Sequence, residues 1–180
     1  MPQGHPILAE FQVVVQRHFT CYMMATMSMN EARKTYANAG PENRIFIGPK
    51  DPSKHPATST MHQRDLYEKM KHDGDFADVL AKALLVEIYS EWDEYFRPLF
   101  ATSIGTEKNK VRCNLLGDLR HVRNCIVHDR SLLAEKHTRL NCLRWFLAPG
   151  PLRITQDMFS TFVKQANDIE VTAEAYPGDA

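Results

Sequence analysis

Residues 115–128 read Leu-Leu-Gly-Asp-Leu-Arg-His-Val-Arg-Asn-Cys-Ile-Val-His, and the spacing of their apolar members predicts one amphipathic helix. At about 100° per residue, one side of this helix collects apolar side chains, which we expect to face the core. These are Val111, Leu115, Leu119, Val122 and Ile126, followed by Leu133 if the helix continues. The opposite side is basic and polar, and Gly117 lies there as a position that another backbone can approach closely.

Three polar residues fall together at the C-terminal end of this predicted helix: Arg123, Asn124 and His128. The directions of Arg123 and His128 differ by about 140°, but both side chains are long enough to touch one small anion, with Asn124 between them. A guanidinium binds phosphate oxygens through paired N–H groups, and an imidazole exchanges protons near neutral pH. The set therefore favours metal-independent cleavage of a phosphodiester.

The motif Arg123-Asn124-x3-His128, preceded by Gly117-Asp118-Leu119-Arg120, resembles the Arg-polar-x(3 to 5)-His signature of HEPN domains, the "higher eukaryotes and prokaryotes nucleotide-binding" helical domains. The resemblance covers residues 75–172, and residues 84–97 look like the long helix that precedes the signature. It implies an all-α fold, an antiparallel helical bundle of roughly four to six helices. It also implies a homodimer in which both motif helices line one shared cleft.

Many HEPN domains are endoribonucleases of toxin–antitoxin, abortive-infection and other antiviral systems, in which the 2′-hydroxyl of the RNA attacks the neighbouring phosphate. The resemblance therefore implies RNA as substrate, 2′,3′-cyclic phosphate products, and an antitoxin or regulatory protein as a further partner. One form of antitoxin modifies a tyrosine two residues after the histidine. This chain has Arg130 at that position, which disfavours that form of neutralisation.

Carried over by position, Arg123 would stabilise the phosphate, His128 would act as general acid or base, and Asn124 would orient the pair. Substrate-binding positions are expected at Arg120, His121 and Arg130, and supporting carboxylates at Glu87 and Asp118. Glu87 follows the apolar run 83–86, so we expect it to lie partly inside, paired with Arg120 or Arg123, because a buried carboxylate needs a partner. The alternative is that Glu87 belongs to a solvated acidic stripe.

The pattern along the chain predicts one HEPN-like domain over residues 1–180, with an N-terminal helix over 7–34, a Pro-rich loop over 40–58 and a HEPN-like core over 75–172. We expect Ile45-Phe46-Ile47 to be a hydrophobic clip docked within that loop. The predicted helix starts are Ser59 or Thr60, Asp75, Thr106 and Thr155, and Pro98 is expected to end or kink the second of these helices. An apolar run, a turn and a second apolar run over 142–154 predict a short β-hairpin.

Charge is balanced overall, with 22 Lys and Arg against 22 Asp and Glu, which is not typical of a non-specific nucleic-acid coat. Residues 65–107 hold ten acidic and four basic residues, whereas residues 108–144 hold nine basic and three acidic ones. The motif lies in the basic segment, where a polyanion would be attracted. Equally, the two segments can pair with each other as packed helices.

The remaining patterns exclude other classes. Cys21, Cys113, Cys125 and Cys142 have no metal-binding spacing and predict reduced interior thiols, and no nucleotide-binding loop is present, so we expect no metal and no cofactor. The start lacks a secretory signal and no apolar run approaches about 20 residues, which predicts a cytoplasmic protein without a membrane span.

Two further interpretations of the motif stay open. An arginine and a histidine near a helix C-terminus also interact favourably with the helix dipole, without any catalytic role. The alternatives to a nuclease are a non-catalytic HEPN-like module that binds nucleotide or protein, and a purely structural helical dimer.

Overall fold

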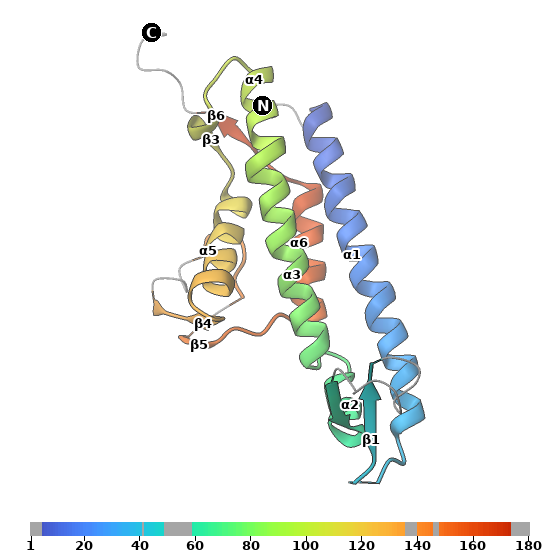
Figure 1. The fold of residues 1–180 in the computed structure, drawn as a ribbon. Coiled ribbons are helices and arrows are strands. Elements are labelled where there is room, and N and C mark those ends of the chain that lie inside the picture. Colours follow the sequence, from blue (N-terminus) through green and yellow to red (C-terminus); the bar gives the residue numbers. More distant parts are fainter. Residues whose placement is uncertain (1–4, 41, 49–58, 136–139, 146–147, 174–180) are drawn as a thin grey trace.

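The structure, a computed structural model, describes residues 5–40, 42–48, 59–135, 140–145 and 148–173. These residues form a mainly helical fold with a few short strands, as the sequence predicts (Figure 1). The helices are α1 (Pro6–Arg33), α2 (Gln63–Lys69), α3 (Asp75–Glu91), α4 (Arg97–Ser103), α5 (Asn114–His128) and α6 (Gln156–Asn167), with the short turns η1 (Lys34–Tyr36), η2 (Trp92–Phe96) and η3 (Lys108–Lys110). The strands pair antiparallel as β1 (Arg44–Ile47) with β2 (Ser59–His62), β3 (Val111–Arg112) with β6 (Thr172–Ala173), and β4 (Leu132–Leu133) with β5 (Gly150–Pro151).

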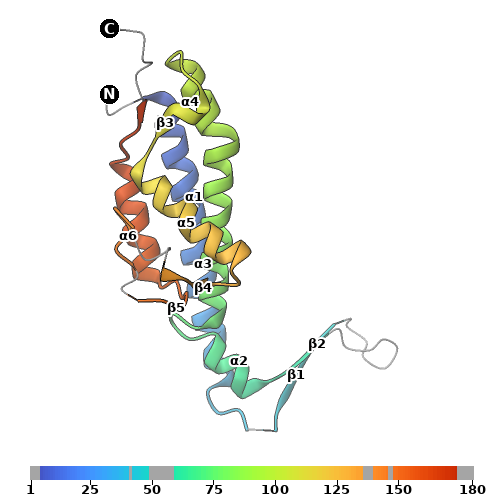
Figure 2. The same ribbon diagram turned by 90° about the vertical axis from the view of Figure 1, so that its left-hand side faces the viewer.

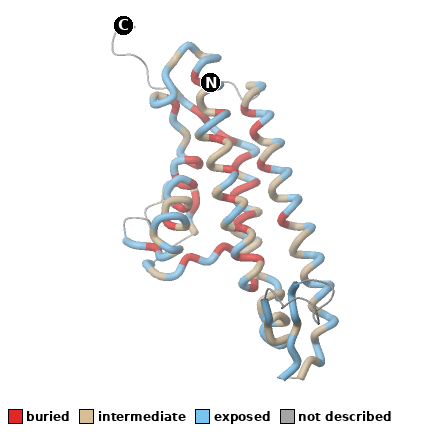
Figure 3. Tube along the Cα trace, viewed as in Figure 1, coloured by how far each residue is buried: buried red, intermediate tan, exposed pale blue. Residues whose placement is uncertain are grey.

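The long helices pack around an aromatic core. Helix α1 is antiparallel to both α3 and α6, and α5 lies against one side of α3, so that it faces the viewer in Figure 2. The centroid of the Phe11 ring on α1 lies 5.2 Å from that of Trp92 and 5.3 Å from that of Phe96. The ring centroids of Tyr22 on α1 and Phe159 on α6 are 5.2 Å apart. Buried positions follow the facing sides of these helices and exposed positions follow their outer sides (Figure 3).

The apolar stripe predicted for the motif helix is confirmed. Val111, Leu115, Leu119 and Val122 are buried, and Leu133 is buried in β4 beyond the helix end. The helix itself begins at Asn114 after an extended Cys113, and not after Thr106. Thr106 is followed instead by the η3 turn and the strand β3, which carry Val111 into the core before the helix starts.

Two other predicted helix ends are corrected by local geometry. Gly74, not Asp75, is the N-cap of α3; a Cβ at Gly74 would lie 2.5 Å from the Lys69 carbonyl oxygen, so no side chain fits there. Pro98 does not end the helical path. It lacks the N–H that would bond the carbonyl four residues earlier, and the π-helical turn η2 absorbs this, with the Arg97 N–H bonded to the Trp92 carbonyl.

The predicted loop 40–58 contains half of a β-hairpin. Strand β1 pairs with β2 so that Ile45 lies opposite Met61, and this hairpin extends away from the long helices (Figure 2). Phe46 is 66% exposed, so the expected docked clip is wrong. Because β2 occupies Ser59–His62, α2 begins only at Gln63. Residues 49–58 of the predicted loop lie outside the described residues.

The expected hairpin over 142–154 is also replaced by a longer-range pair. Pro151 of β5 lies opposite Leu132 of β4, and the Leu152 N–H donates to the Ser131 carbonyl at 2.7 Å. The partner of the second apolar run is therefore the chain directly after α5. Residues 146–147 of the predicted hairpin lie outside the described residues.

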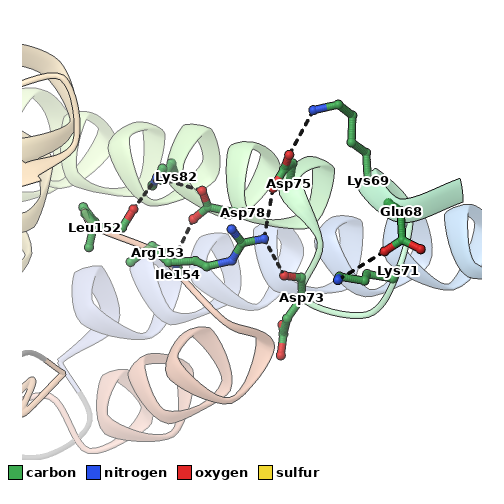
Figure 4. Close-up of polar contacts among 10 residues, drawn as sticks. All are labelled: Glu68, Lys69, Lys71, Asp73, Asp75, Asp78, Lys82, Leu152, Arg153 and Ile154. Carbon is green, nitrogen blue, oxygen red and sulfur yellow. Dashed lines mark hydrogen bonds and ion pairs between the residues drawn. The ribbon is translucent and has the colours of Figure 1, made fainter. Parts of the chain in front are cut away.

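A buried aspartate on α3 fixes the chain that leads into α6. Asp78 accepts the backbone N–H of Ile154 at 2.7 Å and pairs with Lys82, which also donates to the Leu152 carbonyl (Figure 4). Arg153, which lies between Leu152 and Ile154 in the sequence, donates to the Asp75 carboxylate and to a backbone carbonyl in the turn before α3. Helix α6 then begins as predicted, with the Thr155 hydroxyl accepting a backbone N–H in its first turn.

A second buried aspartate, on α5, fixes the chain over residues 141–143. Asp118 is 1% exposed, and its carboxylate accepts the consecutive backbone N–H groups of Asn141, Cys142 and Leu143 at 3.0, 2.6 and 2.8 Å. Consecutive backbone N–H groups form a concave anion site, and bonds to a charged acceptor are stronger than neutral ones. This side chain ties a loop distant in sequence to the inner side of the motif helix.

None of the helices in the described parts of the chain has the length and apolar character that a bilayer span requires. The cysteines are free, as expected, but they are not all interior: Cys125 is buried and Cys21 is exposed on α1.

Replacing Asp118 by asparagine is expected to lower the free energy of unfolding by about 3 kcal/mol, because buried N–H groups lose a charged acceptor. Urea denaturation monitored by circular dichroism measures the change. The matched control is Glu87→Gln on the exposed side of α3, which should stay within about 0.5 kcal/mol of wild type. Equal stability of the two variants would contradict an anchoring role for Asp118.

Candidate functional site

The motif helix stops directly after the predicted histidine. Arg130 and Ser131 both have left-handed backbone, with φ of 52° and 60°, and the Ser131 N–H bonds back to the Cys125 carbonyl at 3.0 Å. Left-handed backbone cannot continue a right-handed helix and is uncommon for residues other than glycine. His128 consequently lies in the last turn of α5, where its side chain is exposed.

The structure brings the three predicted catalytic residues together. Nη1 of Arg123 lies 2.9 Å from Nε2 of His128 and donates to Oδ1 of Asn124 at 3.2 Å. The long side chains therefore bridge the angle that separates Arg123 from His128 around the helix. All of these contacts are made within a single helical turn and its neighbour, so they need no other element to form.

This contact orients the histidine. A guanidinium has only donors, so Nε2 of His128 is the acceptor in this contact and the ring proton is assigned to Nδ1. The Nε2 lone pair is the basic atom of the site, and Arg123 holds it in a fixed direction.

Arg123 keeps unused donors. Its Nε is buried, and no residue that the structure describes accepts a hydrogen bond from it. A buried donor without an acceptor costs roughly 1–3 kcal/mol.

The three expected substrate-binding residues lie around this centre in different ways. Arg120, His121 and Arg130 are all exposed, and no described residue hydrogen-bonds to their side chains. Arg120 lies one turn before Arg123 on the same side of α5. His121 points about 200° away from Arg123 around the helix, and Arg130 lies beyond the helix end, so neither contacts the trio.

Neither of the two expected supporting carboxylates contacts an arginine. Glu87 is exposed, because Ala81, Leu85 and Ile88 define the buried side of α3 and Glu87 lies about 130° from it. The expectation that Glu87 lies partly inside is therefore wrong. Asp118 is buried, but its carboxylate binds the backbone at 141–143.

A basic pocket of about 540 Å³ adjoins the motif and was missed by the sequence analysis. Arg120 of α5 contributes one wall, and the end of α3, η2, the start of α4, η3 and β3 contribute the rest. The lining residues are Tyr89, Asp93, Arg97, Glu107, Lys108, Asn109, Arg112 and Arg120. The available signal was the basic excess of residues 108–144, but the π-helical turn and the η3–β3 connection that bring these side chains together carry no local pattern.

The basic side chains of the pocket are organised by Asp93. Its carboxylate accepts from Nη1 of Arg97 at 2.9 Å and from Nζ of Lys108 at 3.0 Å, and Nη2 of Arg97 also donates to the Val111 carbonyl. Burial alone would raise the pKa of Asp93, but the hydrogen bonds from Lys108 and Arg97 outweigh it and hold the pKa below its ordinary value. Asp93 is thus a fixed anion that orients two cations.

Tyr89 of α3 is one of the residues that line the pocket. Burial raises the pKa of its hydroxyl and Asp93 raises it further, while Arg120, Arg97 and Arg123 oppose the shift. The net shift is upward, so at neutral pH Tyr89 keeps its proton and can donate it in a hydrogen bond.

The described residues give less support to catalysis by a cysteine thiolate or by a metal ion. Burial raises the pKa of the Cys113 thiol to about 11 and also raises that of Cys142, so neither is a thiolate nucleophile at neutral pH. Within the described ranges, no group of three or more His, Cys, Asp or Glu side chains is arranged to hold a metal ion.

Comparisons with family models, with curated proteins and with solved structures found no match to this chain. The site is therefore interpreted from its own geometry.

We expect the neutral form of His128 to carry its proton on Nδ1, because Arg123 occupies Nε2. Long-range ¹⁵N–¹H correlation spectra distinguish the two tautomers. Arg123→Ala should remove the preference, whereas the exposed His72, in the turn between α2 and α3, should show the same tautomer distribution in both proteins. A His128 that is protonated on Nε2 in the wild type would contradict the contact.

The ion pairs of Asp93 should stabilise the fold in a pH-dependent way. Because the folded pKa lies below the ordinary value of 3.8, their contribution is complete at neutral pH and is lost as the pH falls through the folded pKa. The difference in unfolding free energy between wild type and Asp93→Asn should therefore be constant near neutrality and shrink below about pH 4. Glu94→Gln, an exposed change on the same turn, is the control; a wild-type to Asp93→Asn difference that persists unchanged into acid would exclude the ion pairs as its cause.

Proposed function

We propose that this protein is a metal-independent endoribonuclease that holds the scissile phosphodiester of RNA between Arg123 and His128. The observation that carries the proposal is the 2.9 Å contact between Nη1 of Arg123 and Nε2 of His128 in the exposed last turn of α5. Arg123 is permanently charged and can bind a phosphate, and Nε2 of His128 can accept a proton. This is the pair that transfer of a phosphoryl group to a neighbouring hydroxyl requires.

In the proposed reaction, the 2′-hydroxyl of the RNA attacks the adjacent phosphorus and passes its proton to Nε2 of His128. The bond from phosphorus to the 5′-oxygen breaks, which leaves a 2′,3′-cyclic phosphate, and the departing 5′-oxygen takes a proton from water or from a second imidazole. Arg123 offsets the charge on the non-bridging oxygens with its guanidinium, which is permanently charged. Asn124 holds the guanidinium in place.

The biological setting is proposed from the HEPN resemblance of the motif. It favours a toxin or an antiviral, abortive-infection effector in the cytoplasm, a homodimer with both motif helices in one cleft, and an antitoxin or regulatory protein as partner. Gly117 supports close approach of a second chain: it is exposed on the motif side of α5, and a Cβ there would meet nothing within 4 Å. A partner backbone can therefore reach the helix next to Arg120.

A second candidate is a non-catalytic module that binds a nucleotide or a nucleic acid. The observation that favours it is the same contact: a histidine held by an arginine has its basic atom occupied until a ligand separates the two. Binding without cutting would use Arg123 in the same way. The two candidates differ in whether His128 has a role beyond binding.

The decisive experiment incubates wild type, Arg123→Ala and His128→Ala with total RNA in EDTA and analyses the new ends. We expect wild type to produce 2′,3′-cyclic phosphate ends, and either variant to cut at least about 100-fold more slowly, the usual scale of loss for an acid–base group. His72→Ala and Arg64→Ala are matched controls on exposed side chains around α2, far from α5, and should cut like wild type.

Thermal unfolding followed by circular dichroism checks that the variants remain folded. Wild-type protein that binds RNA without cutting it would favour the non-catalytic module. Cutting that survives in His128→Ala would overturn the assignment of the base.

A further inference from the structure

We propose that the basic pocket beside the motif binds a second phosphate of the same RNA, adjacent to the scissile one, and that the bound strand is single. The assignment of the neighbouring phosphate as scissile rests on the proposed function. The binding of a phosphate by the pocket rests on the pocket's own charge and geometry.

Charge is the first argument. Four cationic side chains line the pocket against two carboxylates, and one of these carboxylates, Asp93, is already bound by Arg97 and Lys108. Positive charge therefore exceeds negative charge in a concave site, where the field is focused. Arg97 is only 19% exposed and is held at both ends of its guanidinium, so the cationic wall is ordered before any ligand arrives.

Availability is the second argument. No described residue hydrogen-bonds to the guanidinium of Arg120, so this side chain can bind a phosphate without breaking an existing contact. Tyr89 adds a protonated hydroxyl at the same wall. Arg120 therefore supplies a cation and Tyr89 a neutral donor. A phosphate monoanion can accept hydrogen bonds from both without separating Asp93 from Arg97 and Lys108.

Continuity with the motif is the third argument. Arg120 precedes Arg123 by three residues, which places the two about 4.5 Å apart along the helix axis and about 60° apart around it. Tyr89 is coupled electrostatically to both. A strand that lies along this side of α5 can therefore place one phosphate at Arg123 and the next at Arg120.

The size and lining of the pocket favour a single strand. A volume of about 540 Å³ admits a nucleotide but not the width of a duplex. A positively charged groove with an aromatic side chain is typical of single-strand binding, where bases can be splayed apart. The π-helical turn that positions Asp93 is a feature frequently found at functional sites.

Binding is tested by fluorescence anisotropy with a short fluorescein-labelled oligouridine, in a His128→Ala background that prevents cutting. In single-stranded nucleic acid each lost phosphate contact lowers the salt slope by about 0.7. The double change Arg112→Ala with Arg120→Ala, which removes two of the cations that line the site of this one phosphate, should therefore lower the slope by about 0.7 and the affinity at 0.1 M salt by about fivefold. Arg120→Gln alone should lower the affinity in the same direction and by no more than that.

The matched control is Arg64→Ala with Lys164→Ala, which removes two exposed cations from α2 and α6 and should change affinity by less than about twofold. If the pocket variants bind like this control, the proposal is overturned. Equally tight binding of a duplex of the same length would overturn the single-strand assignment.

Cleavage kinetics separate this proposal from the nuclease proposal. If wild type cuts RNA and the pocket variants have an unchanged KM, the nuclease proposal is supported and the pocket proposal is contradicted. If wild type never cuts RNA and the pocket variants lose affinity, the pocket is supported as a phosphate site and the nuclease proposal is contradicted.

Discussion

The buried carboxylate of Asp118 holds the second half of the chain in place. A charge at this depth is unfavourable unless it is fully hydrogen-bonded, and the consecutive N–H groups of residues 141–143 meet that requirement. Asp78 does the same on α3 for the backbone at Ile154. Asp118 thereby joins α5 to residues 141–143, and Asp78 joins α3 to the chain that leads into α6. The apolar stripe of α5, buried in the common core, packs α5 against α3.

With its inner side committed in this way, α5 can present only its other side to a ligand. Arg123 and His128 lie on that side, and His128 is exposed in the last turn because the helix ends there, before the left-handed residues Arg130 and Ser131. The geometry of the candidate site therefore depends on two local features, the direction of the helix and its end. The basic pocket depends on a third, the π-helical turn that Pro98 imposes on the helical path of α3 and α4.

Features encoded by local periodicity could be predicted from the sequence, and features that depend on distant partners could not. The apolar stripe of α5 could be predicted, as could the start of α6 at Thr155. So could the contacts among Arg123, Asn124 and His128, because each of these features arises within a few turns of a single helix. By contrast, β1 and β5 have partners that are separated from them by a dozen residues or more. The backbone partners of Asp118 could not be predicted for the same reason, because they lie more than twenty residues along the chain. The apolar run before Glu87 does not determine which side of α3 this residue faces, because that side follows from the helical positions of Leu85 and Ile88.

The account of function depends on Arg123 and His128 acting on one phosphate. Titrating isotopically labelled protein with a fully 2′-O-methylated oligouridine, which cannot be cut, tests this most directly by NMR. The guanidinium signals of Arg123 and the imidazole signals of His128 should shift together along one binding curve, as the anion separates the two groups and contacts both. Binding that leaves both sets of signals unmoved, while signals elsewhere respond, would contradict it.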